Sequence, residues 1–395
     1  MKGSERTGVP SLQACAGDLY EQVGDTFVMS YAGSATPRLE PKVWRCGRLW
    51  PISLAFTALL SVGTGPLVRA QDTLSAIASD VQKVYEHAKG AVVRVEAEDE
   101  HGRLSGTGFL VDPNGTIYTS YDVGGESKNI TVDFGANRYP ARRLVADIRS
   151  GIAILKVDAT TPWLNIGKSD EVKTASPIVI IGYPMDLPAT PNFGMVGGLD
   201  LKYLDRYFCT TLIRANIAAQ RGEGGSPVLN LNGEAVGILI SSIDNGAACY
   251  ALPIKAAEKV RTDYLRFGEV RPGWLGVRVG NGDQVIKEST VVITGFSDDS
   301  PAAHAGLENG DVVLQVGTVK IRTAPDDLID ASFFLTAQED VPVTVARGGK
   351  ELTVNVTASE HPMFQGQKAP PFPSLPASGV GLPTPGETPS PANNN

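Results

Sequence analysis

A glycine-rich turn near the middle of the chain holds residue types that acyl chemistry uses. It lies in the stretch Gln220 to Ile238, QRGEGGSPVLNLNGEAVGI. Backbone N–H groups at Gly222 and Gly224 could bind a carbonyl or carboxylate oxygen and stabilise the negative charge that develops there. A serine such as Ser226 becomes a nucleophile only when a base lies within hydrogen-bond reach. The turn therefore predicts a carbonyl-binding backbone and raises the question of which side chain completes it.

Few residues are placed to act as that base. The four histidines are His87, His101, His304 and His361. None falls where a base for the turn is expected, so surface or packing roles are expected for all four. An ordinary carboxylate such as Asp122 is a weak base at neutral pH unless burial raises its pKa. The hydroxyl of Ser226 is expected to be structural or exposed to solvent, and a carboxylate pair of Asp122 and Glu223 acting on water is a further alternative.

Composition excludes several function classes. The 395 residues carry a formal net charge of -8 with no basic run, so neither nucleic acid nor an anionic membrane is a predicted partner. The cysteines lack C-x-x-C spacing and do not cluster with histidine, which predicts isolated thiols, no metal site and no cofactor. They are Cys15, Cys46, Cys209 and Cys249.

The N-terminal region has the layout of an export signal. Arginines precede the apolar run at residues 52–62, and small residues lead to a predicted cut after Ala70. We therefore predict a signal peptide over 45–70 and a location in the periplasm or cell envelope. Residues 1–44 form a doubtful leader, for which a start at Met29 or Val43 is the favoured explanation. After export, Cys209 and Cys249 would reach an oxidising compartment in which they could pair.

The pattern of apolar residues then divides the mature chain. A helix is predicted after the cut, with Asp72 or Thr73 as its N-cap and Gly90 as its end. Its apolar positions are Leu74, Ile77, Val81, Val84 and Ala88. From Ala91 to about Pro253 short runs rich in Val, Ile, Leu and Thr alternate with turn signals, which predicts an antiparallel barrel or sandwich.

A second β-rich block follows a predicted helix at Ile254–Phe267. It covers Trp274 to Ala358, and a Pro-rich tail over 361–395 is predicted to be disordered. With the residues that link them, the predicted domains are 71–262 and 263–360. The fold class is mainly β.

Several of these segments together resemble the HtrA (DegP-like) family over about Thr73 to Ala358. GTGFLVDPNGTIYTSYDVGG is similar to a family segment that ends in the catalytic histidine, and Asp122 holds that position. DIRSGIAILKV places Gly151 where the family has the aspartate that orients the histidine. GEGGSPVLNLNGEAVGI places Gly224 at the nucleophile and Glu223 at the residue before it. The resemblance implies a trypsin-like double β-barrel followed by a PDZ domain.

Asp122, Gly151 and Gly224 thus replace all three residues of the family's catalytic triad, and these substitutions decide which function is expected. Gly224 supplies no nucleophile, and Gly151 is consistent with Asp122 because two facing carboxylates would repel each other. Gly222, Glu223 and Gly224 then form a vestigial oxyanion turn. We therefore expect no catalytic residues and no enzyme activity, only a weak peptide-binding groove in the old cleft.

The second β block is similar to an HtrA-type PDZ domain. GWLGVRV resembles the loop that binds a terminal carboxylate, and SPAAHAGLENGDVVLQVGTVKI resembles a second family block. The predicted peptide-binding residues are Trp274, Leu275, Gly276 and Val277, with the alternative that Trp274 and Leu275 are ordinary core residues. The segment Asp326–Leu335 is expected to be the helix that forms the other wall of the groove.

The favoured function is a catalytically inactive HtrA-like envelope protein that binds unfolded or C-terminal peptides and regulates or chaperones other proteins. The alternatives are an active serine endopeptidase with displaced catalytic residues and a purely structural or assembly protein. The resemblance also implies a homotrimer or a mixed assembly with an active HtrA relative.

Overall fold

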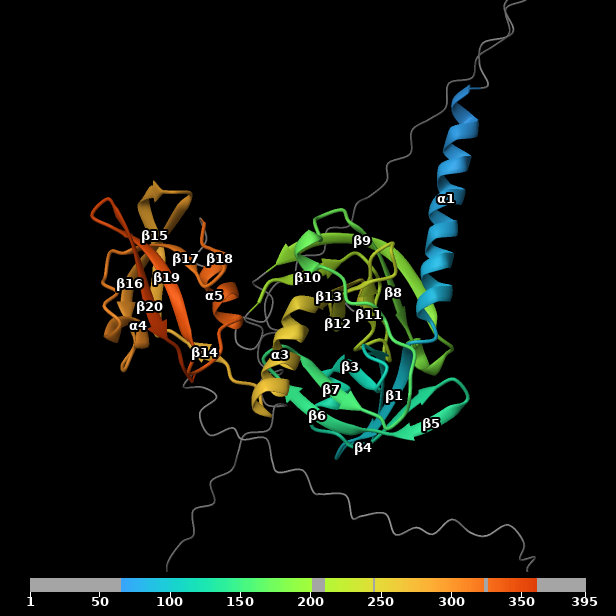
Figure 1. The fold of residues 1–395 in the computed structure, drawn as a ribbon. Helices are drawn as coiled ribbons and strands as arrows, with labels where there is room; N and C mark the ends of the chain where they lie inside the picture. The colour runs from blue at the N-terminus through green and yellow to red at the C-terminus, as the bar shows by residue number, and fades with distance from the viewer. Residues whose placement is uncertain (1–64, 201–209, 244–245, 323–325, 361–395) are drawn as a thin grey trace, which may run out of the picture. The chain divides into compact units, whose positions relative to one another are not determined.

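The computed structural model describes residues 65–200, 210–243, 246–322 and 326–360. The apolar run of the predicted signal peptide, Cys209 and the Pro-rich tail lie outside these residues. The structure is mainly β, as predicted, and Figure 1 shows its strands gathered into two β-rich parts that follow each other along the chain. Among the described helices, none has the length and apolar character that crossing a membrane requires.

The first helix, α1, spans Gly65–Ala88 and begins earlier than the sequence indicated. The predicted N-caps, Asp72 and Thr73, therefore lie inside the helix. Proline is accommodated in a first helical turn because its missing N–H has no partner there, so Pro66 does not delay the start. Val84 and Ala88 are buried against the β domain, whereas Ile77 is exposed.

The first of the two β-rich parts is a domain that begins with a seven-stranded antiparallel sheet, in the order β5-β4-β1-β2-β3-β7-β6. The bounds of its strands are β1 Val92–Glu98, β2 Arg103–Leu110, β3 Thr116–Ser120, β4 Lys128–Phe134, β5 Asn137–Pro140, β6 Arg142–Asp147 and β7 Ile152–Lys156. A short helix, α2, follows β3 at Tyr121–Gly124. The predicted turn signals at Asp112–Gly115 and 135–137 lie between β2 and β3 and at the β4–β5 turn.

The second β part of this domain is a closed barrel in the order β10-β13-β12-β11-β8-β9. Its strands are β8 Pro177–Gly182, β9 Thr190–Asp200, β10 Leu212–Ala215, β11 Pro227–Leu229, β12 Ala235–Ile243 and β13 Ala248–Pro253. Its core contains Cys249, which is fully buried and free of a disulfide, and burial raises the pKa of its thiol to about 12.

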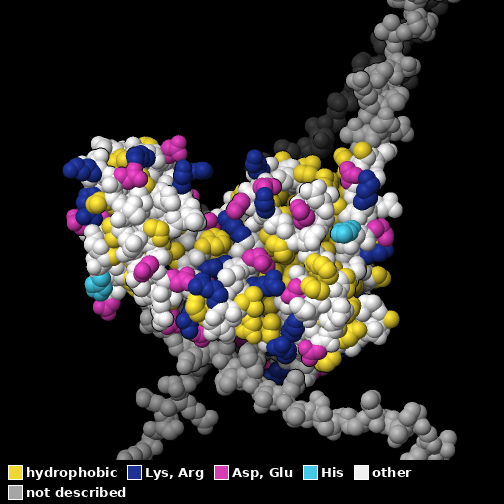
Figure 2. All heavy atoms as spheres, viewed as in Figure 1, with side chains coloured by type: hydrophobic (Ala, Val, Ile, Leu, Met, Phe, Trp, Pro, Cys, Tyr) yellow, Lys and Arg dark blue, Asp and Glu magenta, His cyan; other side chains and the backbone are white. Residues whose placement is uncertain are grey.

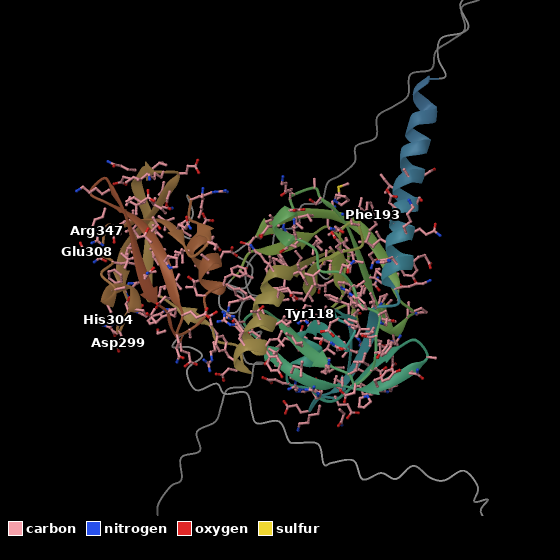
Figure 3. All side chains as sticks on the ribbon, viewed as in Figure 1. Tyr118, Phe193, Asp299, His304, Glu308 and Arg347 are labelled. Atoms are coloured by element: carbon pink, nitrogen blue, oxygen red, sulfur yellow. The ribbon has the colours of Figure 1, made fainter. Side chains whose placement is uncertain are left out.

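Helix α3, Ile254–Phe267, begins and ends where the sequence predicted. Gly268 terminates it at φ 76°, a left-handed backbone that glycine adopts without strain. The helix is fastened to the first sheet by the buried Tyr118, whose hydroxyl donates to Glu258. Figure 3 shows Tyr118 within the β strands of this domain.

The PDZ domain has its own buried core, which includes Val291, Ile293, Val313 and Val345. Its main sheet runs β15-β16-β17-β19-β20, so β15 is an edge strand. The strands are β14 Gly273–Trp274, β15 Val277–Ile286, β16 Ser289–Phe296, β17 Val312–Val316, β18 Val319–Lys320, β19 Asp340–Arg347, β20 Lys350–Thr357 and β21 Ser359–Glu360, and the helices are α4 Pro301–His304 and α5 Asp326–Phe333. Arg347 and Glu308, labelled in Figure 3, form an ion pair at 2.7 Å.

Pairing of the edge strand β15 with β16 is irregular. Its register shifts between Arg278 and Val279 and again between Asn281 and Ile286.

Figure 2 shows acidic and basic side chains mixed on the visible face of each domain, with no broad region of a single sign.

Candidate active site

At two positions, the glycine-rich turn before β11 has a backbone conformation that only glycine tolerates. Gly222 has φ 95° and Gly225 has φ 89°. A Cβ atom added to Gly222 would lie 2.4 Å from the carbonyl oxygen of Tyr183, and one added to Gly225 would lie 2.1 Å from that of Thr107. The close approach of neighbouring backbone therefore fixes the shape of the turn.

Thr107 on β2 ties this turn to the first sheet. Its amide donates to the carbonyl oxygen of Gly224 at 2.9 Å. Its hydroxyl donates to the carbonyl oxygen of Gly222 at 2.7 Å and accepts from the amide of Tyr183 at 3.0 Å. Thr107 has no exposed surface, so these bonds are made away from solvent.

The carbonyl groups of the turn are thus satisfied, but two of its amides are not. Within the described residues, the N–H groups of Gly222 and Gly224 donate to no acceptor. Amides of this kind can receive the oxygen of a bound carbonyl or of a tetrahedral intermediate. Both amides are thus unbonded among the described residues, and the carbonyl-binding role that the sequence predicts for Gly222 and Gly224 stays a prediction.

Glu223 points into the protein between these two glycines. It is 1% exposed, and its carboxylate accepts from Asn192 Nδ2 at 2.8 Å and from the Gln220 amide at 2.7 Å. Burial raises the pKa of this carboxyl above its ordinary value of 4.5, although both hydrogen bonds oppose the rise. Because it is buried among its partners, Glu223 supports the turn, and the carboxylate pair with Asp122 acting on water has no structural support.

The three positions compared with the triad come together at one place. Asp122 lies in α2, and the amide of the preceding Tyr121 donates to the carbonyl oxygen of Gly151 at 2.8 Å. Gly151 has φ 73°, a left-handed conformation that glycine adopts freely and that other residues take uncommonly. Asp122 is exposed at the surface, yet the atoms around its carboxyl still remove enough water to raise its pKa.

A hydroxyl that the sequence comparison missed lies beside the nucleophile position. A Cβ atom added to Gly224 would lie 3.0 Å from Ser120 Oγ. Ser120 is 1% exposed, and its hydroxyl has no hydrogen-bond partner among the described residues. Its place two residues before Asp122 was the only sequence signal that could have drawn attention to it.

Ser226 and the histidines lie elsewhere. Ser226 is completely buried, and its Oγ lies 2.4 Å from where a Cβ of Gly182 would be, so it is beneath the turn and not at its tip. Of the described histidines, His87 is on α1, His101 is in the turn between β1 and β2, and His304 is on α4, where Figure 3 labels it.

The predicted peptide-binding loop Trp274–Val277 leads into the edge strand β15. Gly276 has φ 75°, and a Cβ atom there would lie 2.8 Å from Ser300 Cα. The Leu275 carbonyl oxygen accepts from the Ala302 amide, whereas the amides of Leu275 and Gly276 donate to no described acceptor. The Leu275 side chain belongs to the domain core, so its backbone, not its side chain, is what the loop presents.

Comparison with known proteins agrees with both domains. Residues 106–238 match the trypsin-like peptidase domain and residues 273–358 match the PDZ domain. A probable periplasmic serine endoprotease, DegP-like, from Halomonas elongata is 30% identical over 285 residues, which cover 68% of this chain and 59% of the relative. The chain belongs to the HtrA family.

Another curated relative and a solved structure have a similar degree of likeness to this chain. The protein of the same name from Chlamydia pneumoniae is 28% identical over 280 residues, 67% of this chain and 57% of the relative. This chain thus spans less than two thirds of the length of these relatives. The solved structure of the HtrA-type protease AlgW with a tripeptide has a TM-score of 0.60 at 22% identity, covering 71% of this chain and 97% of that chain, and shows the shared fold.

These relatives correct one expectation from the sequence. The chain was expected not to be an enzyme, but its curated relatives are named serine endoproteases. The expectation followed from the substituted triad positions and from the lack of a histidine expected near the turn, and it did not consider the neighbouring hydroxyl of Ser120.

Replacing Thr107 tests the attachment of the turn. Thr107→Val keeps the volume of the side chain but leaves the Gly222 carbonyl and the Tyr183 amide without partners, so the free energy of unfolding should fall by about 2–4 kcal/mol in urea titrations. Thr107→Ser is the control, because it keeps the hydroxyl and loses about 1 kcal/mol with the methyl group. A valine variant at least as stable as the serine variant would contradict the role of the hydroxyl.

The buried Glu223 predicts a pH dependence of stability. Because its folded pKa is raised, its contribution is fully present below the ordinary pKa of 4.5 and is lost as pH rises through the folded pKa. The unfolding free energy of the wild type should therefore decrease relative to that of Glu223→Gln as pH rises above about 4.5. The exposed Glu100→Gln controls for the loss of one charge, and a difference between wild type and Glu223→Gln that stays constant with pH would refute the prediction.

Proposed function

We propose that this chain is an exported HtrA-type protein that binds C-terminal or unfolded segments of polypeptides through its PDZ domain and cleaves polypeptides as a serine endopeptidase with displaced catalytic residues. The free edge of β15, next to two unbonded loop amides, is the observation that carries the binding function. A bound peptide would extend the sheet, and its terminal carboxylate would accept from those amides.

The endopeptidase part is supported by the backbone of the turn. Gly222 and Gly224 offer their amides to a scissile carbonyl, and the fold that carries them is the one shared with HtrA-type proteases. The names of the curated relatives favour the same activity. Since Gly224 has no side chain, the nucleophile must come from another residue.

The proposed location is supported by the names of the relatives. The curated relatives are named periplasmic, which supports an envelope location for this chain. Assembly into a homotrimer, or with another HtrA protein, is proposed on the resemblance alone, and light scattering of the purified full chain would report it.

A peptide titration tests the binding function. A fluorescent peptide with a free, apolar C-terminal residue should bind the full chain in anisotropy measurements, and amidation of its carboxylate should weaken binding by about tenfold or more, or about 1.4 kcal/mol. Gly276→Ala should weaken it similarly because a Cβ cannot fit beside Ser300.

Gly280→Ala is the matched control on β15, the strand that follows the loop. There the added Cβ would meet only the side chain of Thr294 at 3.2 Å. Equal binding of the free and amidated peptides would overturn the proposed PDZ function.

Hydrolysis is tested with an unfolded protein. Casein incubated with the purified full chain should be cut into fragments identifiable by mass spectrometry, and chain boiled beforehand should produce none. Complete absence of cleavage by the native chain would remove the endopeptidase part and leave peptide binding to stand on its own test.

A further inference from the structure

We propose that Ser120 is the nucleophile that serves in place of the missing side chain at position 224. This inference rests on the proposed endopeptidase function, and it names the residue on which that function depends.

The first observation is that Ser120 makes no use of its hydroxyl in the fold. It ends β3 and is the N-cap residue of α2, with φ -73° and ψ 153°. An N-cap serine usually accepts a hydrogen bond from an amide of the first helical turn, but here there is no such bond. A buried hydroxyl without a partner costs about 1–3 kcal/mol, so its presence calls for a functional explanation.

The second observation is the place at which this hydroxyl lies. Its oxygen is 3.0 Å from the point that a Cβ of residue 224 would occupy, and Ser120 Cβ is 3.6 Å from the same point. The hydroxyl is therefore beside the turn whose Gly222 and Gly224 amides are unbonded. A buried hydroxyl and two unbonded amides thus occur together at this turn.

The proposed base is the carboxylate of Asp122, two residues later in the chain. Asp122 lies in the first turn of α2, and desolvation raises the pKa of its carboxyl, which makes the carboxylate a stronger base. The intervening Tyr121 is not the base, since burial and Glu126 raise the pKa of its phenol to about 12 and its hydroxyl already donates to Glu126 at 2.9 Å.

The reaction would proceed through an ester. Ser120 Oγ bonds to the carbonyl carbon of the peptide as its proton passes to the Asp122 carboxylate, and the oxyanion accepts from the two glycine amides. The C–N bond then breaks as the proton moves from Asp122 to the departing amine. Water hydrolyses the ester, which releases a carboxylic acid and restores the serine. Because Ser120 is buried, substrate binding must be accompanied by rotation of its side chain toward the cleft.

Ser226 provides a matched comparison within the same site. It too is a buried serine with an unpartnered hydroxyl, but its oxygen faces Gly182 beneath the turn. Replacement of either serine by alanine removes an unsatisfied hydroxyl, so both variants should unfold at or above the wild-type temperature.

The experiment compares the full-length wild type with Ser120→Ala, Ser226→Ala and Asp122→Asn. Casein hydrolysis should fall by about 100-fold or more in Ser120→Ala, decrease in Asp122→Asn, and stay within about twofold of wild type in Ser226→Ala. A fluorophosphonate probe should label Ser120 of the wild type, as located by peptide mass spectrometry, which a merely structural role would not produce.

Each other outcome overturns the assignment. Hydrolysis that survives in Ser120→Ala, or a label on a different residue, would leave the endopeptidase but reject Ser120. No hydrolysis and no label in the wild type would reject both, and the peptide titration in the same samples would show whether the PDZ function survives.

Discussion

The geometry of the site depends on one buried threonine. Thr107 belongs to the first sheet, while the residues that it binds, Gly222, Gly224 and Tyr183, belong to the second barrel or its connections. Its hydroxyl and amide satisfy the carbonyl groups of Gly222 and Gly224, while the N–H groups of the same two residues have no described acceptor. The capacity to bind a carbonyl oxygen is therefore a consequence of how the two halves of the domain are joined.

This dependence explains how a carbonyl-binding turn can persist while the side chains around it change. The donors are backbone groups, so they are set by the path of the chain and the two glycines with positive φ, not by the residue at position 224. Side-chain chemistry at the same place is free to be supplied by a neighbouring element. In this chain β3 and α2 meet the turn and bring Ser120 and Asp122 with them.

Much of the fold could be predicted because its signals are local. Alternating apolar runs, the turn at Asp112–Gly115 and the helix Ile254–Phe267 follow from neighbouring residues, and the family resemblance supplied the order of the domains. The start of α1 was placed too late because the helix was expected to begin after the predicted cut at Ala70. Ser120 was missed because it lies beside Gly224, a residue about a hundred positions away in the chain. The expectation of no enzyme activity was made without this long-range neighbour.

The irregular pairing of β15 also bears on solubility. A long, regular edge strand is a template on which a second copy of the same chain can align and aggregate. Here the two register shifts interrupt the pairing of the strand with β16 and divide it into short regular stretches. The edge can therefore remain open to short ligands without inviting the sheet-to-sheet association that would remove the protein from solution.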